Sequence, residues 1–162
     1  MKIVVLKFGG TSVGSIERIK NAVKTIISHH KKGYKVIVVS SAMSGVTNEL
    51  IKKSKQISES FSPSEYDVLV SSGEQVACSL IAARLLHIGL ESRSWLSWQI
   101  PIITKGNHKN AKIIYINKKK ILDYLKKGGI PIIAGFQGID FDERVTTIGR
   151  GGSDASAIMI AK

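Results

Sequence analysis

Two short apolar runs near the start of the chain have the pattern of buried strands. Residues 2–8 read Lys-Ile-Val-Val-Leu-Lys-Phe and residues 36–39 read Val-Ile-Val-Val, and small residues follow each run. Continuous β-branched runs of this kind are typical of parallel strands that are covered on both faces. Between them, apolar residues recur at helical spacing over residues 15–32, and Gly33 follows as a stop signal. The pattern predicts a βαβ unit.

The alternation of strand and helix patterns continues along the chain. Helical spacing predicts helices over residues 46–58, 64–86 with an interruption at Gly73, 117–127, and from residue 154 onward. Apolar runs predict strands at 93–96, 100–104 and 130–134. A hairpin is predicted to join 138–139 to 145–148. This order favours an α/β fold, a three-layer αβα sandwich with a mainly parallel sheet. Such folds bind ligands at the carboxyl ends of their strands.

Composition narrows the class of protein. A chain of 162 residues fits one domain, and the sequence contains no repeat, low-complexity tract or linker. The apolar runs are shorter than the ~20 residues that a membrane span needs, and the first residues lack a signal-peptide layout. The single cysteine, Cys78, excludes an internal disulfide and a cysteine-based zinc cage. We therefore predict a cytoplasmic protein with no membrane segment and no metal site of its own.

The charge raises the question of a nucleic-acid partner, because the formal net charge is +12. The cations are 19 lysines and only 5 arginines, scattered along the chain. Proteins that read phosphates and base edges favour arginine for its bidentate geometry, and the 6% aromatic content is low for a base-stacking surface. The sequence therefore predicts no nucleic-acid partner.

Two groups of small residues stand where predicted strands give way to helices. Lys7 precedes Gly9 and Gly10 at the end of the first strand, a place where backbone amides and a helix dipole receive phosphate. The spacing is neither that of a Walker A loop nor that of a dinucleotide fingerprint. Residues 40–48 repeat the pattern after the second strand, and Thr47 adds a hydroxyl group there. A plain glycine turn with a surface lysine remains the structural alternative.

Two further groups carry charge. Glu74 is predicted at the beginning of an apolar helix, where the positive end of the helix dipole keeps a carboxylate ionised. Residues 149–154 combine Arg150 with three glycines and a Ser-Asp pair that enters a helix, a set suited to clamping a carboxylate. An ordinary helix N-terminal charge and an ordinary N-cap are the alternatives. Taken together, the four groups predict one pocket for a small anionic substrate and a phosphate.

These blocks resemble aspartokinase, a member of the amino-acid kinase superfamily. The resemblance is carried in order by residues 7–14, 44–48, 72–75, 134–138 and 147–154. It implies that residues 1–162 are the N-terminal part of a kinase catalytic domain, with the acceptor half and the first phosphate loop. The remainder of that domain and the regulatory ACT domains are expected to be absent, and the complete enzyme is expected to be a homo-oligomer.

The resemblance also implies the reaction. ATP with Mg2+ would donate its γ-phosphoryl group to the β-carboxylate of L-aspartate, giving 4-phospho-L-aspartate in the first step of lysine, threonine and methionine (diaminopimelate) biosynthesis. Lys7 and Asp154 are the implied catalytic residues, and Lys7, Phe8, Gly9, Gly10 and Ser41 the implied phosphate-binding ones. The residues implied to bind aspartate are Thr47, Glu74, Arg150, Gly151, Gly152 and Ser153. The four histidines match no motif and are expected at the surface or in caps.

Two alternatives to a working aspartokinase stay open. One is another small-molecule kinase of the same superfamily, which a panel of acceptors would distinguish. The other is a non-catalytic fragment that binds substrate. The predicted helix from Asp154 stops without a following strand, so we expect the 162 residues alone to be inactive.

Overall fold

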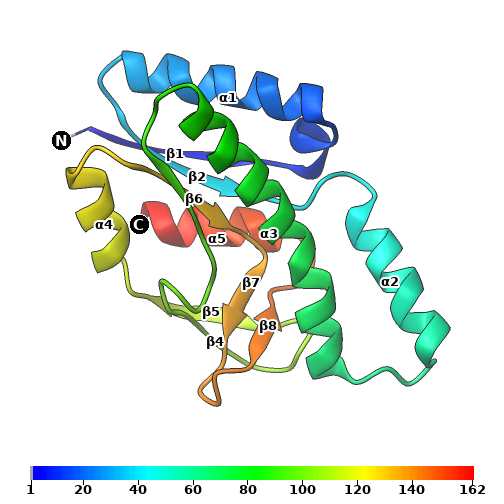
Figure 1. The fold of residues 1–162 in the computed structure, drawn as a ribbon. Coiled ribbons are helices and arrows are strands. Elements are labelled where there is room, and N and C mark those ends of the chain that lie inside the picture. The colour runs from blue at the N-terminus through cyan, green and yellow to red at the C-terminus, as the bar shows by residue number, and fades with distance from the viewer. Residues whose placement is uncertain (1) are drawn as a thin grey trace.

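The computed structural model describes residues 2–162, which form a parallel sheet between two layers of helices (Figure 1). The sheet has the order β1-β2-β6-β3, and all its strands run parallel. These strands are β1 (Ile3–Phe8), β2 (Lys35–Ser40), β6 (Ile130–Ala134) and β3 (Ser92–Trp95). Every residue of β6 is buried, as expected for an inner strand that is covered on both faces. The predicted three-layer α/β fold is therefore confirmed.

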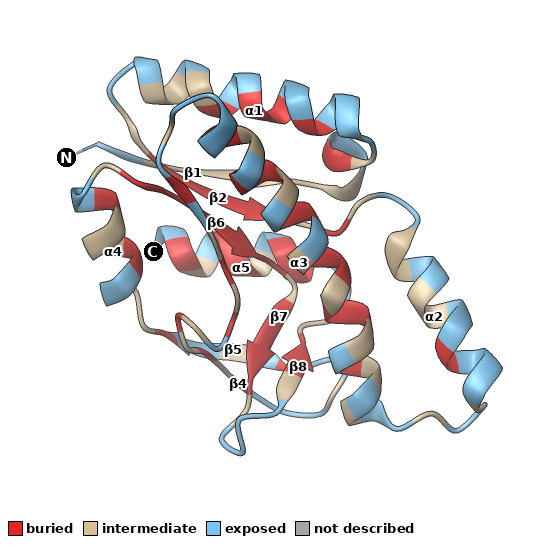
Figure 2. Ribbon diagram, viewed as in Figure 1, coloured by how far each residue is buried: buried red, intermediate tan, exposed pale blue. Residues whose placement is uncertain are grey.

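The two faces of the sheet bury alternate residues of the same strands. Val36 and Val38 of β2 pack with α1 (Ile16–Lys31) and α3 (Pro63–His87) on one face. Ile37 and Val39 pack with α4 (Lys119–Lys126) and α5 (Gly152–Ala161) on the other. This period of two follows from strand geometry, and Figure 2 shows the resulting buried centre beneath more exposed helices.

A second, smaller sheet lies beyond the first, with the order β5-β4-β7-β8. Its strands are β4 (Ile102–Lys105), β5 (Lys112–Ile116), β7 (Gln137–Ile139) and β8 (Val145–Thr147). The predicted hairpin between β7 and β8 is confirmed, since the two strands pair antiparallel. The sequence analysis did not predict β5. Ile114 and Tyr115 of this strand are exposed, so its apolar residues form no continuous buried run.

The interruption predicted at Gly73 is wrong, because α3 is continuous over 25 residues. Gly73 instead allows a close approach between segments. A Cβ atom added there would lie 2.8 Å from the Cβ of Ala42, in the loop after β2. By length and composition α3 could cross a membrane, but half of its most apolar 18-residue stretch is buried inside the protein. It contacts β3, β6, β8 and α2 (Val46–Ile57).

Candidate active site

A cavity of about 670 Å3 opens at the carboxyl ends of β1 and β2, where the chain leaves these strands for helices. This is the edge at which open α/β sheets bind ligands. The cavity brings together the following residues singled out from the sequence: Lys7, Gly9, Gly10, Ser41, Thr47, Glu74, Arg150, Gly151, Gly152, Ser153 and Asp154. Phe8 is the exception, because its side chain packs against the core under α1 and α3 and does not line the cavity.

One end of the cavity is built around an ion pair. Lys7 Nζ of β1 lies 3.0 Å from Asp154 Oδ1, in the first turn of α5, and both side chains are partly exposed. Close approach requires a glycine at position 10, after β1. A Cβ atom on Gly10 would lie 2.9 Å from the carbonyl oxygen of Ala42, a backbone atom that cannot yield easily. A lysine ammonium group therefore stands beside a turn without side chains, an arrangement suited to a phosphoryl group.

The lining of the cavity also includes a buried carboxylate, that of Glu74. Glu74 lies in the middle of α3 and is only 3% exposed. Its Oε1 accepts a hydrogen bond from the Ala42 N–H at 3.0 Å, whereas Oε2 has no partner among residues 2–162. Burial raises the pKa of Glu74 to about 7. The expectation that a helix end keeps this group ionised is therefore wrong, since α3 begins far upstream, at Pro63.

Arg150 stands on a turn that only glycines form easily. Gly149 and Gly151 have φ values of +79° and +76°, in the left-handed region that disfavours residues with a Cβ. A Cβ atom on Gly152 would lie 2.9 Å from Cδ2 of Phe136, so the turn also packs tightly. Within the described chain, the exposed Arg150 guanidinium has no carboxylate at ion-pair distance. Its charge is therefore free to meet an anionic ligand.

The structure adds residues to which the sequence analysis assigned no role in the site, although Phe136 and Thr147 lie in the blocks that resemble aspartokinase. Tyr66, Lys109, Phe136 and Thr147 also line the cavity. Behind them lies Asp67 of α3, whose side chain is fully buried. Asp67 accepts hydrogen bonds from the Thr147 backbone N–H at 3.0 Å and from Thr147 Oγ1 at 2.6 Å.

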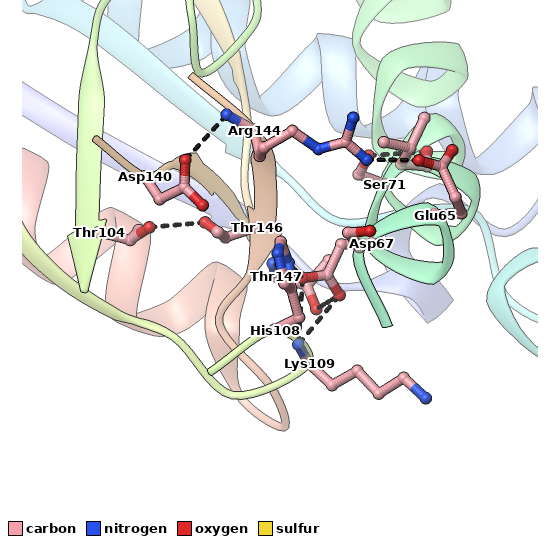
Figure 3. Close-up of polar contacts among 12 residues, drawn as sticks. Glu65, Asp67, Ser71, Thr104, His108, Lys109, Asp140, Arg144, Thr146 and Thr147 are labelled. Atoms are coloured by element: carbon pink, nitrogen blue, oxygen red, sulfur yellow. Dashed lines mark hydrogen bonds and ion pairs between the residues drawn. The ribbon is translucent and has the colours of Figure 1, made fainter. Parts of the chain in front are cut away.

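Asp67 also ties down the segment between β4 and β5. Its Oδ2 lies 2.7 Å from His108 Nδ1, and both its oxygens lie 3.1 Å from the Lys109 backbone nitrogen (Figure 3). The expectation of a surface or capping role for His108 is therefore wrong. The available signal was a carboxylate in the apolar pattern of α3, since buried charges need partners from other segments.

Comparison with known proteins identifies the family. The model of the amino acid kinase family matches residues 2–162. The chain belongs to the amino acid kinase family. This amino acid kinase is 46% identical over 161 residues to aspartokinase 2 of Bacillus subtilis (strain 168), an alignment that covers 99% of this chain and 40% of the relative. It is 47% identical over 164 residues to an aspartokinase of Rickettsia conorii, covering 99% and 41% of the two chains.

Solved structures agree with the fold. E. coli aspartokinase III in complex with aspartate and ADP matches with a TM-score of 0.85 at 23% identity, covering 99% of this chain and 46% of the other. An aspartate kinase from Synechocystis matches with a TM-score of 0.82 at 36% identity, covering 99% and 26%. The resemblance of this amino acid kinase to aspartokinase is confirmed. The chain spans about 40% of the length of the curated relatives it matches.

Proposed function

We propose that the protein is an aspartate kinase, which transfers the γ-phosphoryl group of Mg-ATP to the β-carboxylate of L-aspartate and releases 4-phospho-L-aspartate. The observation that carries the proposal is the charge pattern of one cavity. Lys7 beside its glycine turn suits a phosphoryl group, while Arg150 and the unpartnered oxygen of Glu74 suit the two charged ends of an amino acid. The relatives named aspartokinase, 46–47% identical, support the same reaction.

The acceptor chemistry needs no general base. A carboxylate with an ordinary pKa near ~4 is already ionised at neutral pH and attacks directly. This agrees with a cavity whose described lining contains no histidine and no cysteine. An oxygen of the β-carboxylate bonds to the γ-phosphorus as the bond from that phosphorus to the β,γ-bridging oxygen breaks, and ADP leaves with the bond's electrons. The site therefore contributes alignment and positive charge.

At the phosphate end, the charge that develops on the transferring group meets Lys7. The amides of Gly9 and Gly10 hold its oxygens, Ser41 adds a hydroxyl group, and Asp154 orients the lysine through their 3.0 Å contact. Phe8 contributes only its backbone, because its side chain faces the core. Mg2+ arrives with the nucleotide as part of the substrate. Residues 2–162 contain no group of three or more histidine, cysteine, aspartate or glutamate side chains that could hold a metal.

At the acceptor end, Arg150 binds the α-carboxylate and Glu74 receives the α-ammonium group. Thr47 and Ser153 hydrogen-bond the substrate, and the open backbone of Gly151 and Gly152 lets it approach. We further propose that residues 2–162 supply the acceptor side and the first phosphate loop of a cytoplasmic, homo-oligomeric enzyme of amino-acid biosynthesis. The full reaction is proposed for the natural full-length protein.

The test is an assay of acyl phosphate formed from Mg-ATP by the full-length protein with a panel of amino-acid and carboxylate acceptors. Turnover selective for L-aspartate is expected. Arg150→Ala and Glu74→Gln should raise the aspartate KM at least about tenfold and leave the ATP KM within about twofold, because charged hydrogen bonds contribute roughly 1.5–3 kcal/mol. Arg84→Ala and Glu59→Gln, which lie outside the cavity, serve as controls. Preference for another acceptor would contradict the proposal and favour a different small-molecule kinase.

A further inference from the structure

Lys109 combines a position in the cavity with an unusual backbone. It lines the cavity together with Arg150 and Glu74. Its φ is +68°, in the left-handed region that residues with a side chain rarely adopt. Such a conformation persists only where the surroundings impose it, and it concentrates at functional sites.

Contacts with Asp67 impose this backbone conformation on Lys109. The Lys109 backbone N–H lies 3.1 Å from both carboxylate oxygens of this fully buried side chain. Hydrogen bonds to a charged acceptor are among the stronger ones in proteins, and here they offset the unfavourable φ. The same carboxylate binds Thr147, whose carbonyl oxygen accepts the Ala111 N–H at 2.9 Å. The segment that carries Lys109 is thus fixed against the end of β8.

This attachment brings Lys109 beside the turn that carries Arg150. A Cβ atom on Gly149, the residue before Arg150, would lie 3.2 Å from the Lys109 carbonyl oxygen and 3.0 Å from Asn110 Oδ1. The two backbones are therefore in contact. Two cationic side chains of the cavity arise from adjacent segments.

The Lys109 side chain is directed away from Asp67 (Figure 3). Its Nζ lies 4.4 Å from the ring centroid of Tyr66, which also lines the cavity. In residues 2–162 no carboxylate lies within ion-pair distance of this ammonium group. Lys7 is paired with Asp154, so the unpaired cations that line the cavity are Arg150 and Lys109.

We propose that Lys109 is a substrate-binding residue that holds the α-carboxylate of the acceptor together with Arg150. This inference rests on the proposed aspartate kinase function. The β-carboxylate must face the phosphoryl group near Lys7, so the α-carboxylate is the group left for the turn of Arg150. Because two cations bind this one carboxylate, an acceptor without an α-carboxylate is bound more weakly. Asp67 is the positioning residue, since it holds the backbone of Lys109.

The experiment compares the wild-type full-length protein with Lys109→Met, Lys109→Arg and Lys109→Gly. The aspartate KM and the ATP KM are measured, and L-aspartate binding is titrated calorimetrically. Lys109→Met should weaken aspartate about tenfold, Lys109→Arg less than threefold, and neither should change the ATP KM more than twofold. Lys105→Met is the matched control, because Lys105 is an exposed lysine at the end of β4, just before the same connection, and does not line the cavity.

Lys109→Gly distinguishes the effect of the side-chain charge from the effect of the backbone conformation at position 109. Glycine accepts the positive φ without strain, so this variant should keep or raise the melting temperature and yet bind aspartate as weakly as Lys109→Met. β-Alanine, which is aspartate without its α-carboxylate, should bind equally to the wild type and to Lys109→Met when measured as a competitor. Unchanged aspartate affinity in Lys109→Met, or an equal loss for β-alanine, would overturn the assignment.

The two proposals fail in different ways. If the wild type phosphorylates aspartate and Lys109→Met binds it equally well, only the role of Lys109 is wrong. If the wild type binds aspartate without phosphorylating it, and Lys109→Met loses that binding, the role of Lys109 stands and the kinase proposal fails. If the wild type neither binds nor phosphorylates aspartate, both are overturned.

Discussion

The two ends of the cavity that we propose for phosphate and for the acceptor use charge in opposite ways. At the phosphate end, the Lys7–Asp154 pair is 3.0 Å long, with side chains 28% and 61% exposed. At the acceptor end, the carboxylates of Asp67 and Glu74 are almost completely buried. Water and salt screen the Lys7–Asp154 pair. Asp67 and Glu74 lie in the interior, where charges are poorly screened. The phosphate end is therefore free to rearrange around a ligand, and the acceptor end is organised before the ligand arrives.

This difference separates function from stability. Exposed ion pairs contribute little to folding, so the role proposed for Lys7 predicts that its removal changes the kinetics more than the stability. A buried carboxylate stabilises the fold only while its hydrogen bonds are satisfied, as those of Asp67 are. Substitution of Lys7 should therefore change mainly the kinetics, and substitution of Asp67 mainly the stability of the fold.

The largest effect is expected from Lys7→Ala. Loss of a cation that acts mainly on the transition state should lower kcat by about 100-fold to 1000-fold, as removal of an oxyanion donor does, and raise the aspartate KM far less. The melting temperature should stay nearly constant, because the pair with Asp154 is exposed. Steady-state kinetics and thermal unfolding measure the two quantities. Lys2→Ala, an exposed lysine just before the same strand, is the control, and an unchanged kcat in Lys7→Ala would contradict the assigned role.

Asp67→Asn should show the reverse pattern. An asparagine accepts hydrogen bonds at one side-chain atom only, so donors from Lys109 and Thr147 would lose partners. The expected loss is about 2–4 kcal/mol of unfolding free energy, or about 5–15 °C in melting temperature. Thermal unfolding measures it, with Asp123→Asn as the control, because Asp123 pairs with Lys119 at the surface. A melting temperature equal to that of the control would show that the Asp67 contacts are not stabilising.

The parts of the fold set by one local pattern could be predicted from the sequence. The strands β1 and β2 are continuous apolar runs, and the apolar residues of α1 recur at helical spacing. Glycine or serine stands close to the end of each of these elements. Lys7, Arg150 and Asp154 were found because they stand at strand ends and helix starts, where topology alone brings side chains to one edge.

What could not be predicted depends on contacts between distant segments. Asp67 and His108 are 41 positions apart, and neither residue signals the other in sequence. Gly73 has the signature of a helix break, but its reason is the close approach of Ala42. The state of Glu74 depends on burial, which in turn depends on whether α3 is continuous through Gly73. One wrong boundary therefore reversed the expected electrostatics of the acceptor end.

The smallest effect, a pH dependence, tests the buried acceptor end most directly. Burial raises the pKa of Glu74 from 4.5 to about 7, and an ammonium group is attracted to the ionised form. For a group with this pKa, the ionised fraction rises from roughly 10% to roughly 90% between pH 6 and 8, so kcat/KM for aspartate should rise about tenfold over that range. Stability should change in the opposite direction. A carboxyl group whose pKa is higher in the folded state favours folding below about pH 4.5, and this contribution is lost as the pH rises through about 7.

Glu74→Gln cannot titrate, so it should remove both trends at once, and Glu59→Gln, an exposed glutamate, should keep them. The measurements are the pH profile of kcat/KM and chemical denaturation at pH 5 and pH 8. Opposite pH slopes for kcat/KM and for stability that vanish together in Glu74→Gln would assign both to this one carboxylate. A pH profile that survives in Glu74→Gln would mean that another group titrates, and that the buried Glu74 carboxylate does not control the pH dependence of the reaction with aspartate.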